Sequence, residues 1–321
     1  MVQQGKKERD AMISICIPSY NNPAALRRCV ESVLMQDHKD FELIISDDSD
    51  NPETTNMLAS MSIPGLIYHR NPKPLGSPAN WNHAIQLATR PYVKMLHHDD
   101  EFLHPGALAQ FAQAALQHPN AGLIFSSSCT RFLKSGNEAL NVCTGTQLKR
   151  IRKEPEFLFF RNCIGAPSVT LFKKEGRANF DTRLKWLVDV EFYISRLKQN
   201  AEFVHLPEVL LRVNDGETGQ ITQDVHRNRD LVLHENLLLF AALYKPGLNR
   251  PKSREFFAEL FLQFDINNLK DLQAILTVPK VLQEFIETVF QEMPSRPLLK
   301  RIRKRLLTSR YNKRYFKIER F

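Results

Sequence analysis

Residues 13–23 read Ile-Ser-Ile-Cys-Ile-Pro-Ser-Tyr-Asn-Asn-Pro, and this stretch holds the unit from which the fold can be predicted. The apolar run from Ile13 to Ile17 indicates a buried strand, and Pro18 ends it. Asn22 and Pro23 then supply an N-cap and a proline at the first helical position. Apolar residues at helical spacing follow and predict one buried helix face: Leu26, Cys29, Val30, Val33 and Leu34.

The same unit recurs through the first 126 residues. Further strands are predicted at 41–46, 66–69, 92–96 and 123–126, and further helices open at Asn51-Pro52, Ser77-Pro78 and Pro105. Strands that alternate with capped helices predict an α/β fold, in which a mostly parallel sheet is flanked by helices. In such sheets the ligand binds beyond the carboxyl ends of the strands.

The second half of the chain is less regular. We expect strands at 168–172 and 208–213, and a helix that begins near Asp189. From residue 231 onward the apolar spacing is helical throughout. We therefore predict an α/β domain at residues 1–230 and a helical C-terminal extension at residues 231–321.

The net charge of +9 resides in the last 22 residues, because residues 300–321 hold ten basic residues and one acid, Glu319. The preceding chain is neutral, which argues against a nucleic-acid-binding surface on the main domain. Leu298, Leu299, Ile302, Leu306 and Leu307 would share one face of a basic helix. Such a tail can lie on an anionic membrane surface. A solvated tail, or one docked on a partner, is the alternative.

Cysteine usage and hydropathy indicate a cytoplasmic protein. The five cysteines are scattered, odd in number and without CxxC spacing, as expected for reduced thiols. No apolar run approaches the roughly 18 to 20 residues that span a bilayer, and residues 1–10 lack the apolar core of a signal peptide. We expect a cytoplasmic location, with peripheral contact at the inner face of the membrane if the basic tail binds there.

Polar residues follow three of the predicted strands. They are Pro18-Ser19-Tyr20-Asn21, Asp47-Asp48-Ser49 and His98-Asp99-Asp100. Each segment alone could be an ordinary turn. Because parallel strands end at one edge of a sheet, all three are expected around one crevice.

The segment His97-His98-Asp99-Asp100 is a costly cluster of like charge unless a cation neutralises it. Carboxylate oxygens with an optional nitrogen suit Mg²⁺ or Mn²⁺, which in turn suit a diphosphate-bearing substrate. The chain has neither a GxxxxGK[ST] nor a GxGxxG motif, so phosphates would be held through the metal. A solvated acidic turn is the other interpretation of the cluster.

With these residues in view, the chain resembles the family 2 glycosyltransferases of the GT-A fold over residues 11–215. Five segments carry the resemblance in order: residues 13–21, residues 41–49, Asn80-Trp81-Asn82, the His-His-Asp-Asp segment followed by Pro105, and residues 183–197 centred on Asp189. The resemblance implies the nucleotide-diphospho-sugar transferase fold and a metal-dependent transfer with inversion at the anomeric carbon.

The resemblance also implies roles for single residues. Pro18, Ser19 and Tyr20 would line the nucleotide pocket. Asp48 would accept a hydrogen bond from the nucleotide base, and Asp47 would lie beside Asp48. Asn82 would lie near the nucleotide or donor sugar, and His98 and Asp99 near the nucleotide. Asp99 and Asp100 would bind the metal, Mn²⁺ or Mg²⁺. Asp189 would be the general base that deprotonates the acceptor hydroxyl.

Two positions depart from the family pattern. His97 stands where the family commonly has the first Asp of Asp-x-Asp-Asp, and an imidazole does not carry the same charge. Asn214 stands where many relatives have a His after an Arg, which puts a third protein ligand from that loop in doubt. For Asp189, a helix N-cap or first-turn acid is the structural alternative.

The resemblance implies a nucleotide-diphospho-sugar donor, with a UDP-sugar favoured over GDP- or dTDP-sugars. The acceptor would be a saccharide or a lipid-linked sugar, in the synthesis of a surface polysaccharide or glycolipid. A glycosyltransferase-like binding module that lost turnover is one alternative, and His97 supports it. A sugar nucleotidyltransferase is the other, but residues 18–21 do not resemble the Gly-rich, basic loop that such an enzyme requires.

Overall fold

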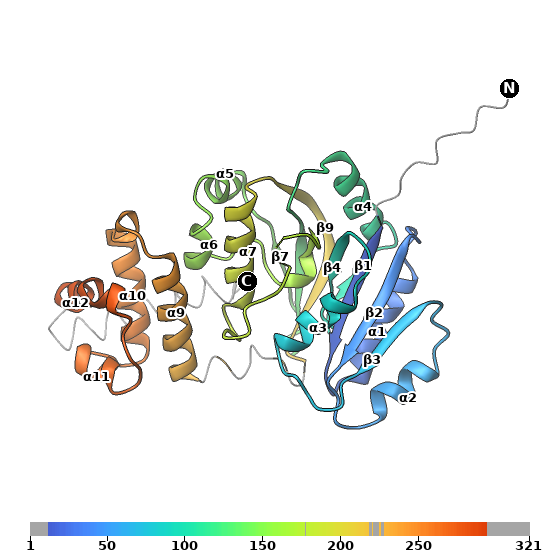
Figure 1. Ribbon diagram of the computed structural model, residues 1–321, viewed down its shortest axis with the longest axis horizontal. Coiled ribbons are helices and arrows are strands. Elements are labelled where there is room, and N and C mark those ends of the chain that lie inside the picture. The colour runs from blue at the N-terminus through green and yellow to red at the C-terminus, as the bar shows by residue number, and fades with distance from the viewer. Residues whose placement is uncertain (1–11, 177, 218–219, 221–224, 226–227, 294–321) are drawn as a thin grey trace. The chain divides into compact units, whose positions relative to one another are not determined.

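A computed structural model describes residues 12–293, except 177, 218–219, 221–224 and 226–227 (Figure 1). The chain forms two compact units. The first comprises residues up to 155 together with 163–220, and the second comprises 156–162 together with the chain from 221 onward. The predicted boundary at residue 230 therefore lies ten residues beyond this division, and the short segment 156–162 joins the helical unit.

The first unit is built on one sheet, with nine strands in the part of the chain that the structure describes. They are β1 (Ile13–Ser19), β2 (Phe41–Asp47), β3 (Leu66–Arg70), β4 (Tyr92–Met95), β5 (Glu101–Phe102), β6 (Leu123–Phe132), β7 (Glu138–Asn141), β8 (Thr170–Lys173) and β9 (Phe203–Asp215). Their order is β3-β2-β1-β4-β8-β6-β9-β5, with β7 paired to β6. Strands β3, β2, β1 and β4 are parallel, β8 is antiparallel to both β4 and β6, and β9 is parallel to β6.

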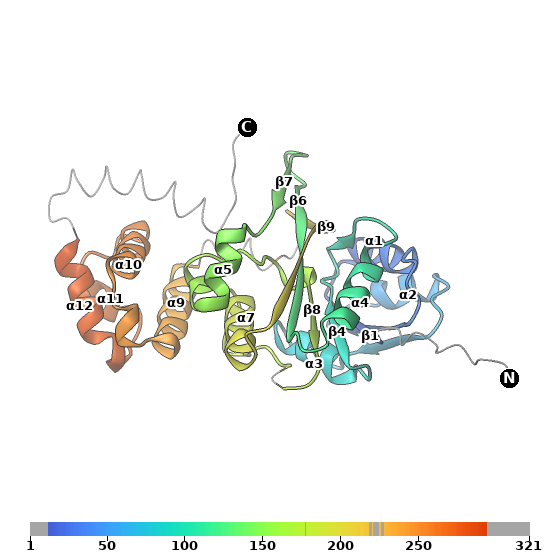
Figure 2. The same ribbon diagram turned by 90° about the horizontal axis from the view of Figure 1, so that it is seen from above.

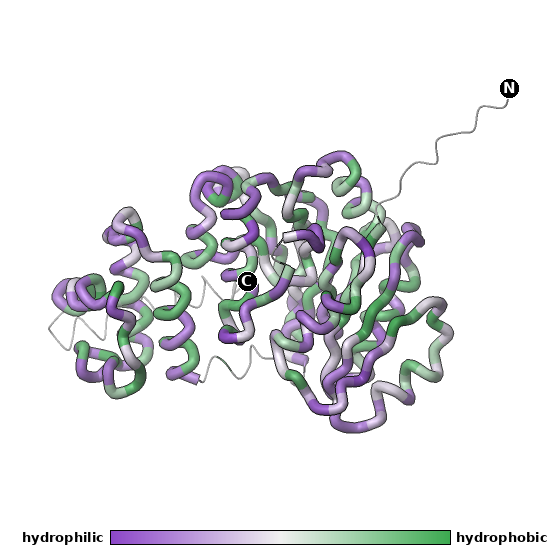
Figure 3. Tube along the Cα trace, viewed as in Figure 1, coloured by the Kyte–Doolittle hydropathy of each residue, from purple (hydrophilic) through white to green (hydrophobic). Residues whose placement is uncertain are grey.

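Helices cover both faces of this sheet. They are α1 (Pro23–Leu34), α2 (Glu53–Ala59), α3 (Ala79–Leu87), α4 (Ala107–Gln117), α5 (Gly145–Lys153) and α7 (Val188–Gln199), with the short 3₁₀ turn η1 (Pro167–Val169) before β8. Figure 2 shows α1 and α4 on one side of β1 and β4, and α3 on the other side. All seven residues of β1 are buried, and Figure 3 shows the apolar residues concentrated along the strands. The α/β fold predicted from the alternating units is confirmed.

The first predicted cap has the expected geometry. The Asn22 side chain accepts a hydrogen bond from Ala25 N at 3.0 Å, and Pro23 occupies the first helical position. Since the first backbone N–H groups of a helix lack partners within the helix, this pair fixes where α1 begins. The start of α1 in turn fixes the polar loop at residues 20–22, directly after β1.

Strands β5 and β7 and helix α5 were not expected from the sequence. Strand β5 is only two residues long, and β7 is an edge strand with no fully buried residue. Helix α5 buries a single residue, Ile151, so it has no apolar stripe to detect. A capping box at Thr144 and Gln147 starts this helix instead.

The second unit is helical, as predicted from residue 231 onward. It contains α6 (Phe157–Phe160), α9 (Arg229–Leu243), η2 (Pro246–Leu248), α10 (Pro251–Gln263), α11 (Leu269–Gln273), η3 (Lys280–Leu282) and α12 (Gln283–Glu292). Aromatic rings from four of these helices pack together: Phe159, Phe240, Phe257 and Phe285. The basic tail at residues 298–321 lies outside the described residues. Among the helices that are described, none has both the length and the apolar character to cross a membrane.

Replacement of Phe257 by alanine should destabilise the helical unit. The Phe257 side chain has no exposed surface, and its ring lies 4.8 Å from that of Phe240 and 5.5 Å from that of Phe285. We expect the free energy of unfolding of this unit to fall by about 3–5 kcal/mol in urea denaturation followed by circular dichroism. Val281→Ala, at a side chain that is 54% exposed, should change it by less than about 0.5 kcal/mol. Equal losses in the two variants would contradict this description of the core.

Candidate functional site

The parallel strands bring the predicted polar loops to one edge of the sheet. In the strand register Ser19 lies beside Asp47, and Cys16 lies beside Met95. Hydrogen bonds continue this register past the strand ends, from Asp48 N to Ser19 O at 2.9 Å and from Leu96 N to Cys16 O at 3.0 Å. The three loops expected around one crevice therefore do start side by side.

Residues 97–101, here called the acidic loop, bring three metal-ligand side chains together. One ligand atom each of His97, Asp99 and Asp100 lies within 4.8 Å of the other two. Asp100 is buried, whereas Asp99 and His97 are half-buried. Burial raises the pKa of Asp100 well above its usual value, and the negative charge of Asp99 raises it further. Two adjacent carboxylates in this setting are disfavoured in their ionised form unless a cation lies between them.

His97 completes a donor set that fits a divalent cation. Its Nε2 atom is buried and has no hydrogen-bond partner among the described residues. Burial lowers the pKa of His97 to about 4, so the ring is neutral at neutral pH and has a nitrogen lone pair to offer. Two carboxylates and one neutral imidazole suit Mn²⁺, and also Mg²⁺ with a weaker nitrogen contact.

His98 serves a different purpose from His97. Its Nδ1 lies 3.2 Å from the carbonyl oxygen of Pro18. Because a carbonyl oxygen only accepts, Nδ1 carries the proton and donates it. His98 thus ties the acidic loop to the end of β1. The next residue of β1, Ser19, has a buried hydroxyl that makes no hydrogen bond to the described residues.

Hydrogen bonds from residues distant in sequence hold the acidic loop in place. The Asn214 side chain donates to Asp99 O at 2.6 Å and to Glu101 Oε1 at 3.1 Å, and Asn214 N donates to Asp100 Oδ1 at 3.2 Å. Gln220 Nε2 donates to Asp99 Oδ2 at 2.5 Å. The asparagine that stands in place of a family histidine therefore holds the acidic loop through its amide group.

The two aspartates at the end of β2, Asp47 and Asp48, hold neighbouring segments in place. Asp47 is wholly buried and accepts hydrogen bonds from Ser49 N and Oγ and from the Tyr68 hydroxyl. Asp48 accepts from Asn71 Nδ2 at 2.7 Å, Leu75 N at 3.0 Å and Gly76 N at 2.8 Å. Their predicted contact with the nucleotide base stays a prediction. In this structure the Asp48 carboxylate holds the loop at residues 71–76, and the Asp47 carboxylate holds Ser49 and Tyr68.

Tyr20 and Asn82 have different surroundings. The Tyr20 side chain is 47% exposed, so its ring is accessible beside the loop after β1. Asn82 is engaged with the backbone of Phe180, to which it donates at 2.9 Å and from which it accepts at 2.7 Å. Asn82 thereby fixes the segment that leads into α7, and its predicted place near the donor sugar remains a prediction.

Asp189 is the second residue of α7 and is half-buried. Its Oδ1 accepts a hydrogen bond from Val190 N at 2.8 Å. Burial raises the pKa of Tyr193 in the same helix, and the negative charge of Asp189 raises it further. A row of packed rings joins this helix to the acidic loop. Ring centroids are 4.5 Å apart between His97 and Trp81, 5.2 Å between Trp81 and Phe180, and 4.2 Å between Phe180 and Phe192.

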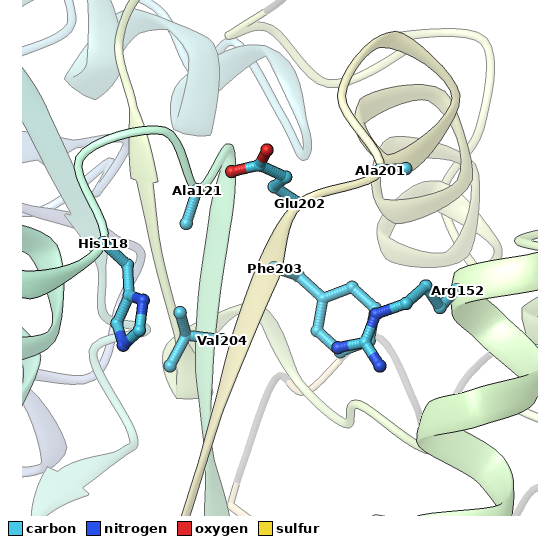
Figure 4. A pocket seen from close by; sticks show the side chains of 7 residues that line it. All are labelled: His118, Ala121, Arg152, Ala201, Glu202, Phe203 and Val204. Atoms are coloured by element: carbon cyan, nitrogen blue, oxygen red, sulfur yellow. The ribbon is translucent and has the colours of Figure 1, made fainter.

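A separate pocket lies at the other end of the sheet, with a cavity volume of about 300 Å³ (Figure 4). Its lining residues are His118, Ala121, Arg152, Ala201, Glu202, Phe203 and Val204. They gather where β6 and β9 begin, whereas the acidic loop follows the end of β4. The guanidinium of Arg152 lies 4.6 Å from the ring centroid of Phe203. The lining includes none of the predicted site residues.

Sequence comparison identifies the family to which this site belongs. Residues 14–165 match the model of glycosyl transferase family 2, a span that includes β1, the acidic loop and the loops that adjoin them. The chain contains a glycosyl transferase family 2 domain. The resemblance noted from the motifs is confirmed.

Similar proteins extend this match. The chain is 30% identical to an uncharacterized protein of Mycobacterium tuberculosis over 59% of its own length and 63% of that protein's length. It is 26% identical to the putative colanic acid biosynthesis glycosyl transferase WcaA of Escherichia coli, over 67% of this chain and 77% of WcaA. It is 30% identical to a Campylobacter jejuni β-1,3-glucosyltransferase named for a diphospho-undecaprenol-linked acceptor, over 32% of this chain and 34% of that enzyme.

Solved structures of other proteins share the GT-A fold with this chain. The structure of Staphylococcus aureus TarS residues 1–349 with UDP-GlcNAc matches 94% of this chain and 91% of its own, with a TM-score of 0.55 at 13% identity. The mannosyltransferase PcManGT of Pyrobaculum calidifontis with GDP-Man and Mn²⁺ matches 96% of this chain and 88% of its own, with a TM-score of 0.54 at 15% identity.

Conversion of Asn214 to aspartate should loosen the acidic loop. The change removes the amide donor to Asp99 O and puts a carboxylate about 3.1 Å from Glu101 Oε1. We expect the free energy of unfolding to fall by about 1–3 kcal/mol, measured by chemical denaturation. Asn137→Asp, at an exposed turn after β6, is the matched control and should have little effect. No difference between the two variants would show that Asn214 does not hold this loop.

Proposed function

We propose that this protein is a metal-dependent, inverting glycosyltransferase that transfers a sugar from a nucleotide-diphospho-sugar to an acceptor hydroxyl. The observation that carries the proposal is the donor set of His97, Asp99 and Asp100 directly after β4. The buried Nε2 of His97 has no hydrogen-bond partner among the described residues. A buried carboxylate beside a half-buried one, with a neutral imidazole close by, favours a divalent cation.

In this proposal the crevice at the strand ends binds the donor. Pro18, Ser19 and Tyr20 line the nucleotide pocket, and the buried Ser19 hydroxyl has no hydrogen-bond partner among the described residues. Asp48 borders the nucleotide base, and Asp47 lies next to Asp48. Asn82 and His98 support the loops on either side, through Phe180 and Pro18 respectively.

Asp99 and Asp100 hold the cation, and His97 Nε2 is available as a nitrogen ligand. Mn²⁺ or Mg²⁺ bound here supplies the electrostatic stabilisation of the leaving diphosphate. Asp189 acts as the general base and accepts the proton of the acceptor hydroxyl as the oxygen attacks the anomeric carbon. A single displacement of this kind inverts the configuration at that carbon.

The similar proteins support the donor and acceptor classes. TarS was solved with UDP-GlcNAc and PcManGT with GDP-Man and Mn²⁺, which supports a nucleotide-sugar donor. Within this class we propose a UDP-sugar, with GDP- and dTDP-sugars as alternatives. WcaA is named for colanic acid biosynthesis, and the Campylobacter enzyme for a lipid-linked acceptor. We therefore propose a saccharide or lipid-linked acceptor at the cytoplasmic face of a membrane, with the basic tail as a peripheral contact.

Substitutions at three aspartates test the proposal. Asp99→Asn, Asp100→Asn and Asp189→Asn should each lower transfer, or donor hydrolysis when the acceptor is unknown, by about 10²- to 10⁴-fold. Asp50→Asn, at an exposed carboxylate near the same edge, should retain activity. Activity is assayed with UDP-, GDP- and dTDP-sugars in Mn²⁺ and in EDTA.

The same assay separates the proposed enzyme from a binding module. A module without turnover would show a nucleotide-sugar-dependent thermal shift but neither transfer nor hydrolysis with any donor. Full activity of Asp99→Asn and Asp189→Asn would remove the proposed catalytic site. Unchanged activity in EDTA would contradict the proposed metal dependence.

A further inference from the structure

Ser168 connects β8 to the acidic loop, although 68 residues or more separate the two in sequence. It lies in η1, immediately before β8, and is fully buried. Its hydroxyl accepts a hydrogen bond from His97 N at 2.9 Å and is hydrogen-bonded to the Asp100 carboxylate. Its carbonyl oxygen accepts a hydrogen bond from Lys94 Nζ. One serine therefore contacts the strand before the acidic loop, the start of the loop and a proposed metal ligand.

The direction of these hydrogen bonds follows from the groups involved. The backbone N–H of His97 donates, so the Ser168 oxygen accepts there and its single proton is free to point to Asp100. Asn214 N donates to Oδ1 of the same carboxylate at 3.2 Å. Two donors from separate parts of the sheet thus fix the rotation of the Asp100 side chain before any ligand binds.

Lys94 holds the backbone of Ser168 through a hydrogen bond to its carbonyl oxygen. It is a fully buried lysine whose ammonium donates to Met95 O at 3.1 Å and to Ser168 O. The same ammonium lies 4.9 Å from the ring centroid of Phe111 and 5.4 Å from that of Phe102. A buried ammonium is costly, so its contacts with two carbonyl groups and two ring faces are what keep it inside.

The segment around Ser168 also contacts the helix that carries Asp189. The Tyr193 hydroxyl in α7 donates to Gly165 O at 3.2 Å. The Asn141 side chain donates to Ile164 O at 3.3 Å. Gly165 has a φ of +109°, and a Cβ there would lie 2.5 Å from Asn141 Nδ2, so the close approach requires glycine. These contacts hold the start of the segment that leads to Ser168.

We propose that Ser168 is a positioning residue that holds the Asp100 carboxylate in its metal-binding orientation, and that Lys94 anchors Ser168 in place. The inference rests on the proposed function, because it requires a divalent cation at the acidic loop. Ser168 itself touches neither cation nor substrate. Its effect passes through Asp100, so its loss should weaken cation binding more than it slows turnover at saturating cation.

Ser168→Ala and Ser168→Thr test this role in the full-length protein. Mn²⁺ binding without nucleotide is measured by the loss of the free Mn²⁺ signal in electron paramagnetic resonance. Ser168→Ala should raise the Mn²⁺ Kd by about 10- to 100-fold, the range for a hydrogen bond to a charged group. Ser168→Thr keeps the hydroxyl and should stay within about threefold of the wild-type Kd. Lys94→Met should raise the Kd in the same direction as Ser168→Ala.

The matched control is Ser126→Ala in the neighbouring strand β6. The Ser126 hydroxyl is buried and makes no hydrogen bond within the described part of the chain, so its removal should leave Mn²⁺ binding unchanged. Thermal unfolding establishes that each variant is folded. If transfer is measured, Ser168→Ala should raise the Mn²⁺ concentration needed for half-maximal rate, with kcat at saturating Mn²⁺ within about threefold of wild type.

The outcomes separate this inference from the proposed function. Wild-type Mn²⁺ affinity in folded Ser168→Ala would overturn the role of Ser168, while Mn²⁺-dependent transfer by the wild type would leave the proposed function intact. Equal losses of affinity in folded Ser168→Ala and Ser168→Thr would also overturn it, because the hydroxyl would then not be the responsible group. No Mn²⁺ binding by the wild type would overturn both.

Discussion

The negative charge of Asp99 and Asp100 is the constraint on which the site depends. Both carboxylates belong to one short loop, and burial of Asp100 makes its ionised form costly. Hydrogen-bond donors surround the pair: the Ser168 hydroxyl and Asn214 N act on Asp100, and the Gln220 amide acts on Asp99. Lys94 adds a buried positive charge near Asp100, and burial lowers the pKa of Lys94 to about 7. These groups reduce the free-energy cost of ionising both carboxylates but do not remove it. A cation bound between the carboxylates would reduce that cost further.

The sheet explains why these groups meet. Four parallel strands end at one edge and deliver the loops after β1, β2 and β4, while β8 and β9 bring Ser168 and Asn214 to the acidic loop from the mixed half of the sheet. The packed rings of Trp81, Phe180 and Phe192 then extend from His97 to the helix of Asp189. Proposed cation ligands and proposed base are thus supported by one continuous set of contacts within the first unit.

Local signals in the sequence were sufficient for the main strands, the first helix cap and the acidic loop, because each depends on neighbouring residues. They missed β5, which is too short for a pattern, and α5, which has no apolar stripe. They also missed the supports of the site. Ser168 meets His97 across 71 positions and Gln220 meets Asp99 across 121, so no local pattern marks either residue. The loop-holding contacts of Asp48 with Leu75 and Gly76 were hidden for the same reason.

The central claim is that a cation at the acidic loop joins this chain to a nucleotide diphosphate. A crystal structure of the protein with Mn²⁺ and UDP, with anomalous diffraction recorded at the manganese edge, tests it most directly. We predict an anomalous peak within about 2.0–2.3 Å of a carboxylate oxygen of Asp99 or Asp100 and of a diphosphate oxygen, with the uridine beside Tyr20. Bound UDP with no anomalous peak at Asp99 and Asp100 would contradict the claim.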